Sequence, residues 1–315
     1  MIEIYKTIDG VLTKLETPET GCWVNVCNPT EEEKTYLIND LKVMPEFLKQ
    51  ALDEEESPHI DYDDDADQRL IMVDFPVFYP DIENKVTDLQ YQTAPLGIIT
   101  YNGYIITISL HECLELIDFK GGVVKGLNTT MKTRFFLTLM LRVSQRYLSY
   151  LRQIDKLSSL TEEKLHRSMQ NQELIQMLGL EKSLVYFSTS LKTDEIIMNK
   201  ILRGKVIKLY DEDQDLIDDV LIELHQAIEM CNIYSNILSG TMDAFASVIS
   251  NNLNIVMKIL AVITIVMSIP NIIFGFYGMN VEHIPGAEFW FIPLIITVVI
   301  CIILIIIFKK KKMFK

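Results

Sequence analysis

A row of small and polar residues crosses an otherwise apolar segment near the end of the chain. Its members recur every three or four residues: Asn254, Met257, Ala261, Thr264, Ser268, Asn271, Gly275 and Gly278. This spacing places them on one face of an α-helix, here called the polar stripe. Polar side chains are costly in lipid unless they face protein or water. Close helix packing through small residues is the alternative, but two hydroxyls and two amides together favour the lining of a wet pore.

Two segments are apolar enough to cross a membrane. Residues 259–276 and residues 289–308 contain no charged side chain. At about 1.5 Å rise per residue, helices of these lengths span a hydrocarbon layer of roughly 30 Å. Two core helices of a soluble protein are the alternative reading. Pro270 should loosen the first helix and free a backbone carbonyl, whose direction the sequence leaves open.

Basic residues lie on one side of these spans. Lys309–Lys312 and Lys315 follow the second span, whereas residues 277–288 contain no Lys or Arg. The positive-inside rule therefore predicts that both chain ends are cytoplasmic and that the short connection faces outward. A single helix cannot enclose a pore, so the polar stripe also requires several copies of the chain around one axis.

The rest of the chain is acidic. Formal net charge is −14, and residues 1–253 alone hold 23 basic and 41 acidic side chains, a net charge of −18. Such a surface repels nucleic acid and attracts cations. The five cysteines show no CxxC spacing and are expected to be reduced packing residues. The chain has no Gly-rich nucleotide loop or catalytic constellation, so we expect neither an enzyme nor a prosthetic group.

The pattern of turns and periodicity predicts an α/β domain followed by helices. Thr30 and Glu33 form a capping-box pattern, and Asn102-Gly103 between β-branched runs predicts a tight hairpin. Strands are expected at 69–79 and 96–101, and helices at 135–156 and 162–202. The expected organisation is an acidic cytosolic α/β domain (1–127), a helical hairpin (128–205), the cytosolic part of a stalk helix (206–258), a first transmembrane helix (259–276), an external loop (277–288), a second transmembrane helix (289–308) and a basic cytosolic tail (309–315).

One helix is expected to join the cytosolic domain to the first span. Apolar positions alternate by four and three from Ile217 to Val266, with no Gly or Pro at the membrane boundary. A seam of this length predicts one continuous helix, from Asp215 to Phe276, that packs lengthwise on its neighbours.

The tetrapeptide Tyr277-Gly278-Met279-Asn280, placed between two terminal spans and followed by a basic tail, resembles the CorA magnesium transporter family. The resemblance implies a funnel-shaped homopentamer whose first spans line a central pore. It implies that Asn280 forms an outer ring for a hydrated ion, that Gly278 allows close backbone approach, and that Tyr277 and Met279 brace the loop. Mg²⁺ holds its water tightly, so neutral oxygen rings suit it.

The resemblance also assigns positions along the pore. Asn254 matches a polar ring near the cytosolic mouth, and Leu260 matches an apolar constriction. Ser268 and Asn271 replace the methionine and threonine common in the family, and the external loop around Glu282 lacks a glutamate often found after its proline. These departures bear on ion selectivity.

A regulatory metal site between subunits is the last implication of the resemblance. Asp219 matches one of its acidic residues, whereas Gln50 stands where its partner is usually found. Asp53 and Glu54 lie about one turn further on and could replace that partner. A solvated acidic surface is the alternative explanation.

The function expected is channel-like transport of divalent cations, Mg²⁺ first and also Co²⁺ or Ni²⁺, driven by the membrane potential and gated by cytosolic metal. The partners expected are copies of the chain, the lipid bilayer and divalent cations. Two alternatives remain: a Zn²⁺ importer of the same fold, and a membrane sensor or scaffold that transports nothing.

Overall fold

The computed structural model describes residues 1–79, 91–168, 171–204, 207–279 and 289–311. Its contacts divide the chain into two units, Met1–Gly240 and Thr241–Lys315, which are described separately below. Helix α6 (Gln214–Tyr277) contributes residues to both units.

The first unit is built on one seven-stranded sheet. Its strand order is β2-β1-β3-β7-β6-β5-β4, and only the β3–β7 pair is parallel. The strands are β1 (Ile2–Ile8), β2 (Val11–Leu15), β3 (Trp23–Cys27), β4 (Ile60–Asp63), β5 (Gln68–Phe78), β6 (Tyr91–Tyr101) and β7 (Tyr104–Ser109).

The predicted hairpin is confirmed. Strands β6 and β7 pair in an antiparallel manner, with Tyr101 opposite Tyr104. Asn102 and Gly103 have φ angles of 43° and 91°, the left-handed pair that a two-residue hairpin turn requires. The preceding strand begins at Tyr91, five residues earlier than expected, because β6 pairs with the whole of β5 as far as Phe78.

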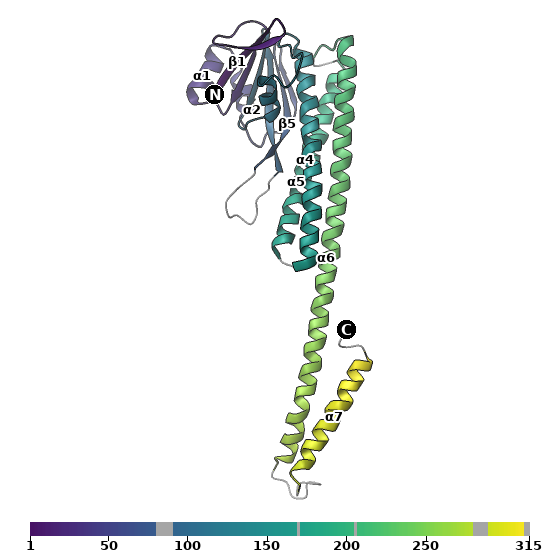
Figure 1. Ribbon diagram of the computed structural model, residues 1–315. Helices are drawn as coiled ribbons and strands as arrows, with labels where there is room; N and C mark the ends of the chain where they lie inside the picture. Colours follow the sequence, from purple (N-terminus) through teal and green to yellow (C-terminus); the bar gives the residue numbers. More distant parts are fainter. Residues whose placement is uncertain (80–90, 169–170, 205–206, 280–288, 312–315) are drawn as a thin grey trace. The chain divides into compact units, whose positions relative to one another are not determined.

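Helices cover both faces of the sheet (Figure 1). Helices α1 (Glu31–Asn39) and α2 (Pro45–Ala51) pack on one face, where Leu70 and Met72 of β5 join the core. Successive strand residues point to opposite faces, so Ile71 and Val73 face the other side. The predicted capping box of α1 is confirmed: Thr30 accepts from the Glu33 amide and the Glu33 side chain accepts from Thr30.

The second face is covered by α4 (Lys132–Ser168) and α5 (Asn171–Leu202), while α3 (Leu114–Lys120) adds Phe119 to an aromatic group with Trp23 and Phe135.

The prediction that the first long helix ends at Lys156 is wrong. Helix α4 continues through a Ser- and Thr-containing stretch, and Thr161 Oγ1 donates to the Leu157 carbonyl 2.8 Å away. A hydroxyl satisfied in this way is compatible with the helix interior.

The predicted continuous helix is confirmed as α6, which begins after a short 3-10 turn at Asp211–Asp213. Its 64 residues make it about 96 Å long. The seam packs inside the first unit, where Ile217, Leu224 and Cys231 are fully buried. Helix α7 (Phe291–Lys310) follows, and both α6 and α7 are long and apolar enough to cross a membrane.

Candidate functional site

The polar stripe lies on α6 within the second unit, and nearly all its members are exposed in a single chain. Asn254, Thr264 and Asn271 are exposed, and Ser268 is half-buried. Met257, Leu260 and Met279 are 57%, 55% and 53% exposed, and Ala261 and Gly275 are exposed as well. The stripe is therefore an uncovered surface of the second unit.

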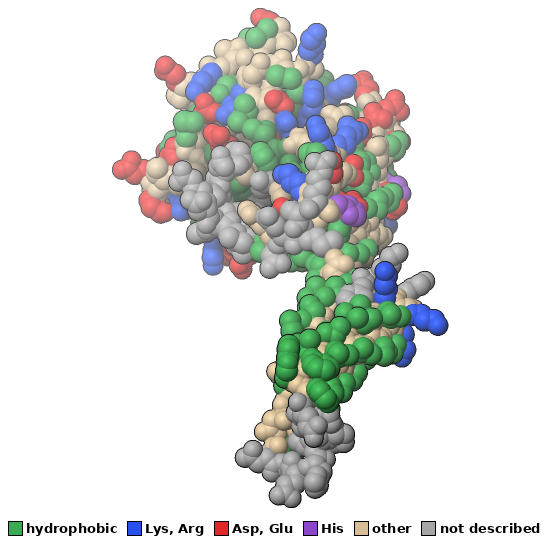
Figure 2. All heavy atoms as spheres, turned by 60° about the horizontal axis from the view of Figure 1, so that its bottom comes forward, with side chains coloured by type: hydrophobic (Ala, Val, Ile, Leu, Met, Phe, Trp, Pro, Cys, Tyr) green, Lys and Arg blue, Asp and Glu red, His purple; other side chains and the backbone are tan. Residues whose placement is uncertain are grey.

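The opposite side of α6 is covered by α7. Val262 is 1% exposed and Thr297 of α7 is 7% exposed, so these side chains lie at the contact between the two helices. At about 100° per residue, Val262 and Val266 lie across the helix from Thr264 and Asn271. The packing of α7 thus leaves the polar stripe free. Figure 2 shows the apolar side chains of this unit as a green surface with basic side chains at one end, and Lys309 and Lys310 form the last turn of α7.

The two stripe hydroxyls direct their protons into the helix. Thr264 Oγ1 donates to the Leu260 carbonyl at 2.9 Å, and Ser268 Oγ donates to the Thr264 carbonyl at 2.8 Å. Each hydroxyl keeps its oxygen lone pairs, which remain available to a donor such as the water around a cation. These side chains therefore present acceptors along the stripe.

Pro270 lies inside α6 and removes the donor that would otherwise bond the Val266 carbonyl. The structure gives this carbonyl a different neighbour, because Cys301 Sγ of α7 lies 3.9 Å from Val266 O. The freed carbonyl faces α7 and not the polar stripe. The acceptors that the stripe offers are therefore side chains.

Helix α6 ends in the first part of the tetrapeptide. The Gly278 amide bonds the Phe274 carbonyl at 2.9 Å, and the Met279 amide bonds Phe276 O at 3.4 Å. A Cβ at position 278 would lie 3.1 Å from Phe274 O, so glycine fits this tight final turn best. Tyr277 is half-buried beside the ring of Phe276. Asn280 and Glu282 lie outside the described residues.

The expected regulatory acids lie in the first unit. Asp219 is exposed on α6, and Asp53 follows α2, with its Oδ1 accepting from the Glu55 amide at 3.0 Å. Glu54 Oε1 lies 3.5 Å from His111 Nε2. In the part of a single chain that the structure describes, no group of three or more acidic, His or Cys residues is placed to hold a metal ion.

A buried acidic pair escaped the sequence reasoning. Asp74 of β5 and Asp194 of α5 are 8% and 0% exposed, and Asp194 Oδ1 accepts from the Asp74 amide at 3.1 Å. The Ser190 hydroxyl donates to Asp74 Oδ2 and lies 3.1 Å from Thr93 Oγ1. Burial raises the pKa of Asp74 to about 6 despite the Ser190 bond. Burial, with the Asp74 charge, raises the pKa of Asp194 well above its usual range. The sequence did hold one sign of this pair, because Asp74 is an acidic residue inside the otherwise apolar strand expected at 69–79.

Comparison with known proteins agrees with this architecture. A family model described as CorA-like Mg²⁺ transporter protein matches residues 18–310. The cobalt/magnesium transport protein CorA of Methanocaldococcus jannaschii is 28% identical over 290 residues, which cover 88% of this chain and 86% of that protein. The protein of the same name from Thermotoga maritima is 30% identical over 131 residues, which cover 38% of this chain and 37% of its own length.

The fold has a solved counterpart over nearly its whole length. The complete structure of the CorA magnesium transporter from M. jannaschii superposes with a TM-score of 0.82 at 24% identity, covering 98% of this chain and 97% of that one. The family match extends through both apolar helices, which identifies them as membrane helices. The chain is a membrane protein and belongs to the CorA-like Mg²⁺ transporter family.

Proposed function

We propose that this chain transports divalent cations across a membrane, through a pore lined by the polar stripes of several subunits. The observation that carries the proposal is the exposed stripe on α6, opposite the face that α7 covers. Amide and hydroxyl oxygens facing lipid would carry a free-energy cost, because polar groups there lose their hydrogen bonds to water. Facing other copies of itself around an axis, it provides a wet channel.

The chemistry of the stripe suits a hydrated ion. Asn254, Thr264 and Asn271 present neutral oxygen acceptors at successive levels, which can hold the water shell of Mg²⁺ without trapping the ion. Leu260, exposed between them, supplies an apolar level that can close by dewetting. We infer Mg²⁺ as the main substrate and Co²⁺ as a second, in line with the names of the two CorA relatives.

The assembly we propose is a homopentamer with both chain ends in the cytosol. In this orientation Asn280 forms the outer ring and Lys309–Lys311 contact the cytosolic surface of the bilayer. Inward movement of a doubly charged ion then releases about 4.6 kcal/mol per 100 mV, so transport needs no nucleotide hydrolysis.

Cytosolic metal is proposed to close the channel. Asp219 of one subunit would face Asp53 or Glu54 of the next, and domains of charge −18 would repel each other until Mg²⁺ neutralises the contact. As internal Mg²⁺ rises, the closed arrangement becomes favoured. Transport would then limit itself.

Ion uptake into proteoliposomes tests the proposal. The purified full-length chain should admit Mg²⁺ and Co²⁺ under an inside-negative potential, and Asn280→Ala should reduce uptake strongly. Competition among Mg²⁺, Co²⁺, Ni²⁺ and Zn²⁺ in the same vesicles orders the substrates. Absence of flux for all four ions, or an Asn280→Ala variant equal to wild type, would contradict the proposal.

A further inference from the structure

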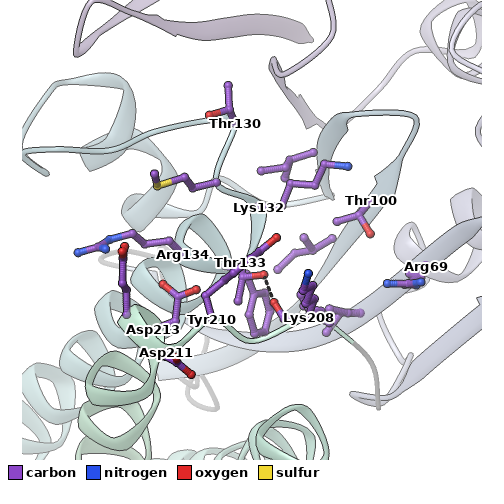
Figure 3. A pocket seen from close by; sticks show the side chains of 17 residues that line it. Arg69, Thr100, Thr130, Lys132, Thr133, Arg134, Lys208, Tyr210, Asp211 and Asp213 are labelled. Carbon is purple, nitrogen blue, oxygen red and sulfur yellow. Dashed lines mark hydrogen bonds between the residues drawn. The ribbon is translucent and has the colours of Figure 1, made fainter. Parts of the chain in front are cut away.

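A cavity of about 770 Å³ opens in the first unit, away from the membrane segments. Its walls come from strands β5, β6 and β7, from the first turn of α4, and from the segment that leads into α6 (Figure 3). The Thr133 hydroxyl donates to the Lys208 carbonyl at 3.0 Å and so joins two of these walls. A space of this size is typical of pockets that enclose a small organic ligand.

One wall is basic, although the domain as a whole is strongly acidic. Figure 3 shows Arg69, Lys132 and Lys208 on one side of the cavity, together with Thr100. Lys132 and Lys208 make no ion pair with any residue in the described ranges. A second cavity, of about 350 Å³, is also lined by Arg69, Lys132 and Thr100, so these side chains stand where two hollows meet.

The electrostatics of this wall favour an anion. Burial lowers the pKa of the half-buried Lys132; the charge of Asp67 opposes this shift, and the smaller effect of the Arg69 charge lowers the pKa further. Two cations that repel each other at a cavity wall are both stabilised when an anion lies between them. The first turn of α4 also lines the cavity and contains no acidic side chain, so the positive end of the helix dipole adds to the same field.

The remaining walls can hold the rest of such a ligand. Ile71, Ile98 and Phe136 are at most 2% exposed and form an apolar floor. Tyr210 is 55% exposed at the cavity, and Lys208 Nζ lies 5.2 Å from the centroid of its ring. On the wall away from Arg69 and Lys132, three acids line the cavity, Asp211, Glu212 and Asp213. Their carboxylate oxygens are of the kind that commonly accept hydrogen bonds from sugar hydroxyls.

We propose that this cavity binds a ligand of the nucleotide class. Its phosphates would contact Arg69, Lys132 and Lys208, its sugar hydroxyls would bond Asp211, and its base would lie against Tyr210 and the apolar floor. Arg and Lys are the side chains that recognise phosphate through charged hydrogen bonds. The turn containing Asp211 leads directly into α6, so the ligand contacts the start of the helix that carries the polar stripe.

Calorimetric titration of the full-length chain in detergent tests this site. The buffer contains EDTA, so that binding of divalent metal contributes no heat. ATP and ADP should bind, and adenosine should bind at least about tenfold more weakly, since it lacks the phosphates. Inorganic phosphate binding as tightly as ATP would overturn the nucleotide assignment and leave a bare anion site. Absence of ATP binding at millimolar concentration would overturn the site itself.

Matched variants locate the binding. Lys132→Gln should weaken ATP at least about tenfold, whereas Lys200→Gln, which removes an exposed cation of α5 outside the cavity, should leave affinity unchanged. If Lys132→Gln does not fold, the exposed Lys208→Gln carries the same comparison. Equal affinity in wild type and in the folded cavity variants would refute the assignment. Because binding is read without ion flux, this outcome would leave the transport proposal unaffected.

Discussion

Replacing Asp74 by Asn should stabilise the protein at neutral pH and have a much smaller effect in mild acid. Asp74 is 8% exposed; its carboxyl accepts a hydrogen bond from the Ser190 hydroxyl, and its backbone amide donates to the Asp194 carboxyl. Among the residues that the structure describes, no cation is a cause of the raised pKa of either acid. An Asn side chain has the same shape, accepts from Ser190 and cannot ionise.

The magnitude follows from the pKa of Asp74, which rises from 3.8 to about 6 on folding. The folded state then holds a proton more tightly than the unfolded chain. The contribution of this carboxyl to the free energy of unfolding is therefore fully present below pH 3.8 and is lost as pH rises through about 6. The loss is about 3 kcal/mol. Asp194 acts in the same direction.

The assay is thermal unfolding of the full-length chain in detergent between pH 4.5 and pH 8, for wild type and Asp74→Asn. At roughly 2–4 °C per kcal/mol, the variant should melt about 6–12 °C higher than wild type at pH 8, where about 3 kcal/mol is lost, and only about 2–4 °C higher at pH 4.5, where about 1 kcal/mol is lost. Asp64→Asn, which neutralises an exposed acid in the turn before β5, should shift neither value. A variant that melts at or below wild type throughout would refute the account of this pair.

Further substitutions test the turn, the end of α6 and the regulatory acid. Gly103→Ala should lower the free energy of unfolding by about 1–3 kcal/mol, because φ is 91° and the new Cβ would lie 2.6 Å from a threonine methyl. Gly240→Ala, in open helix surface, should raise it by up to about 1 kcal/mol, and chemical denaturation compares the two. Gly278→Ala should reduce Mg²⁺ flux, because its new Cβ would lie 3.1 Å from the Phe274 carbonyl oxygen. Asp219→Asn should leave flux less sensitive to internal Mg²⁺, and equal inhibition would exclude Asp219 from regulation.

Local signals were sufficient for much of the fold. The seam from Ile217 onward predicts the continuous helix, since no Gly or Pro stands at the membrane boundary, and Asn102-Gly103 predicts the hairpin by its backbone preference. The continuation of α4 past Lys156 could not be predicted in the same way. Its hydroxyl side chains can either bond back to a carbonyl of their own helix, as Thr161 does, or favour a turn, and polar composition alone does not distinguish the two.

The long-range contacts were beyond sequence reasoning. Asp74 and Asp194 are 120 residues apart, and only folding brings them together. The same holds for the Val266 carbonyl, whose direction toward Cys301 depends on how α7 packs. The polar stripe itself could be predicted because its residues share one helix. Its exposure required the structure, since the sequence does not say which face α7 covers.

The central claim, that the stripe of α6 lines the pore, is tested most directly by a pair of isosteric variants. Thr264 on the stripe and Thr297 on α7 each donate to a carbonyl of their own helix, at 2.9 and 2.7 Å, but Thr264 is exposed and Thr297 is 7% exposed. In proteoliposomes, Thr264→Val should lower Mg²⁺ flux at least about fivefold, because each subunit loses about 1 kcal/mol of hydrogen bonding to the passing hydrated ion. Thr297→Val should leave flux unchanged. Equal flux in both variants, or a loss confined to Thr297→Val, would contradict the assignment of this face to the pore.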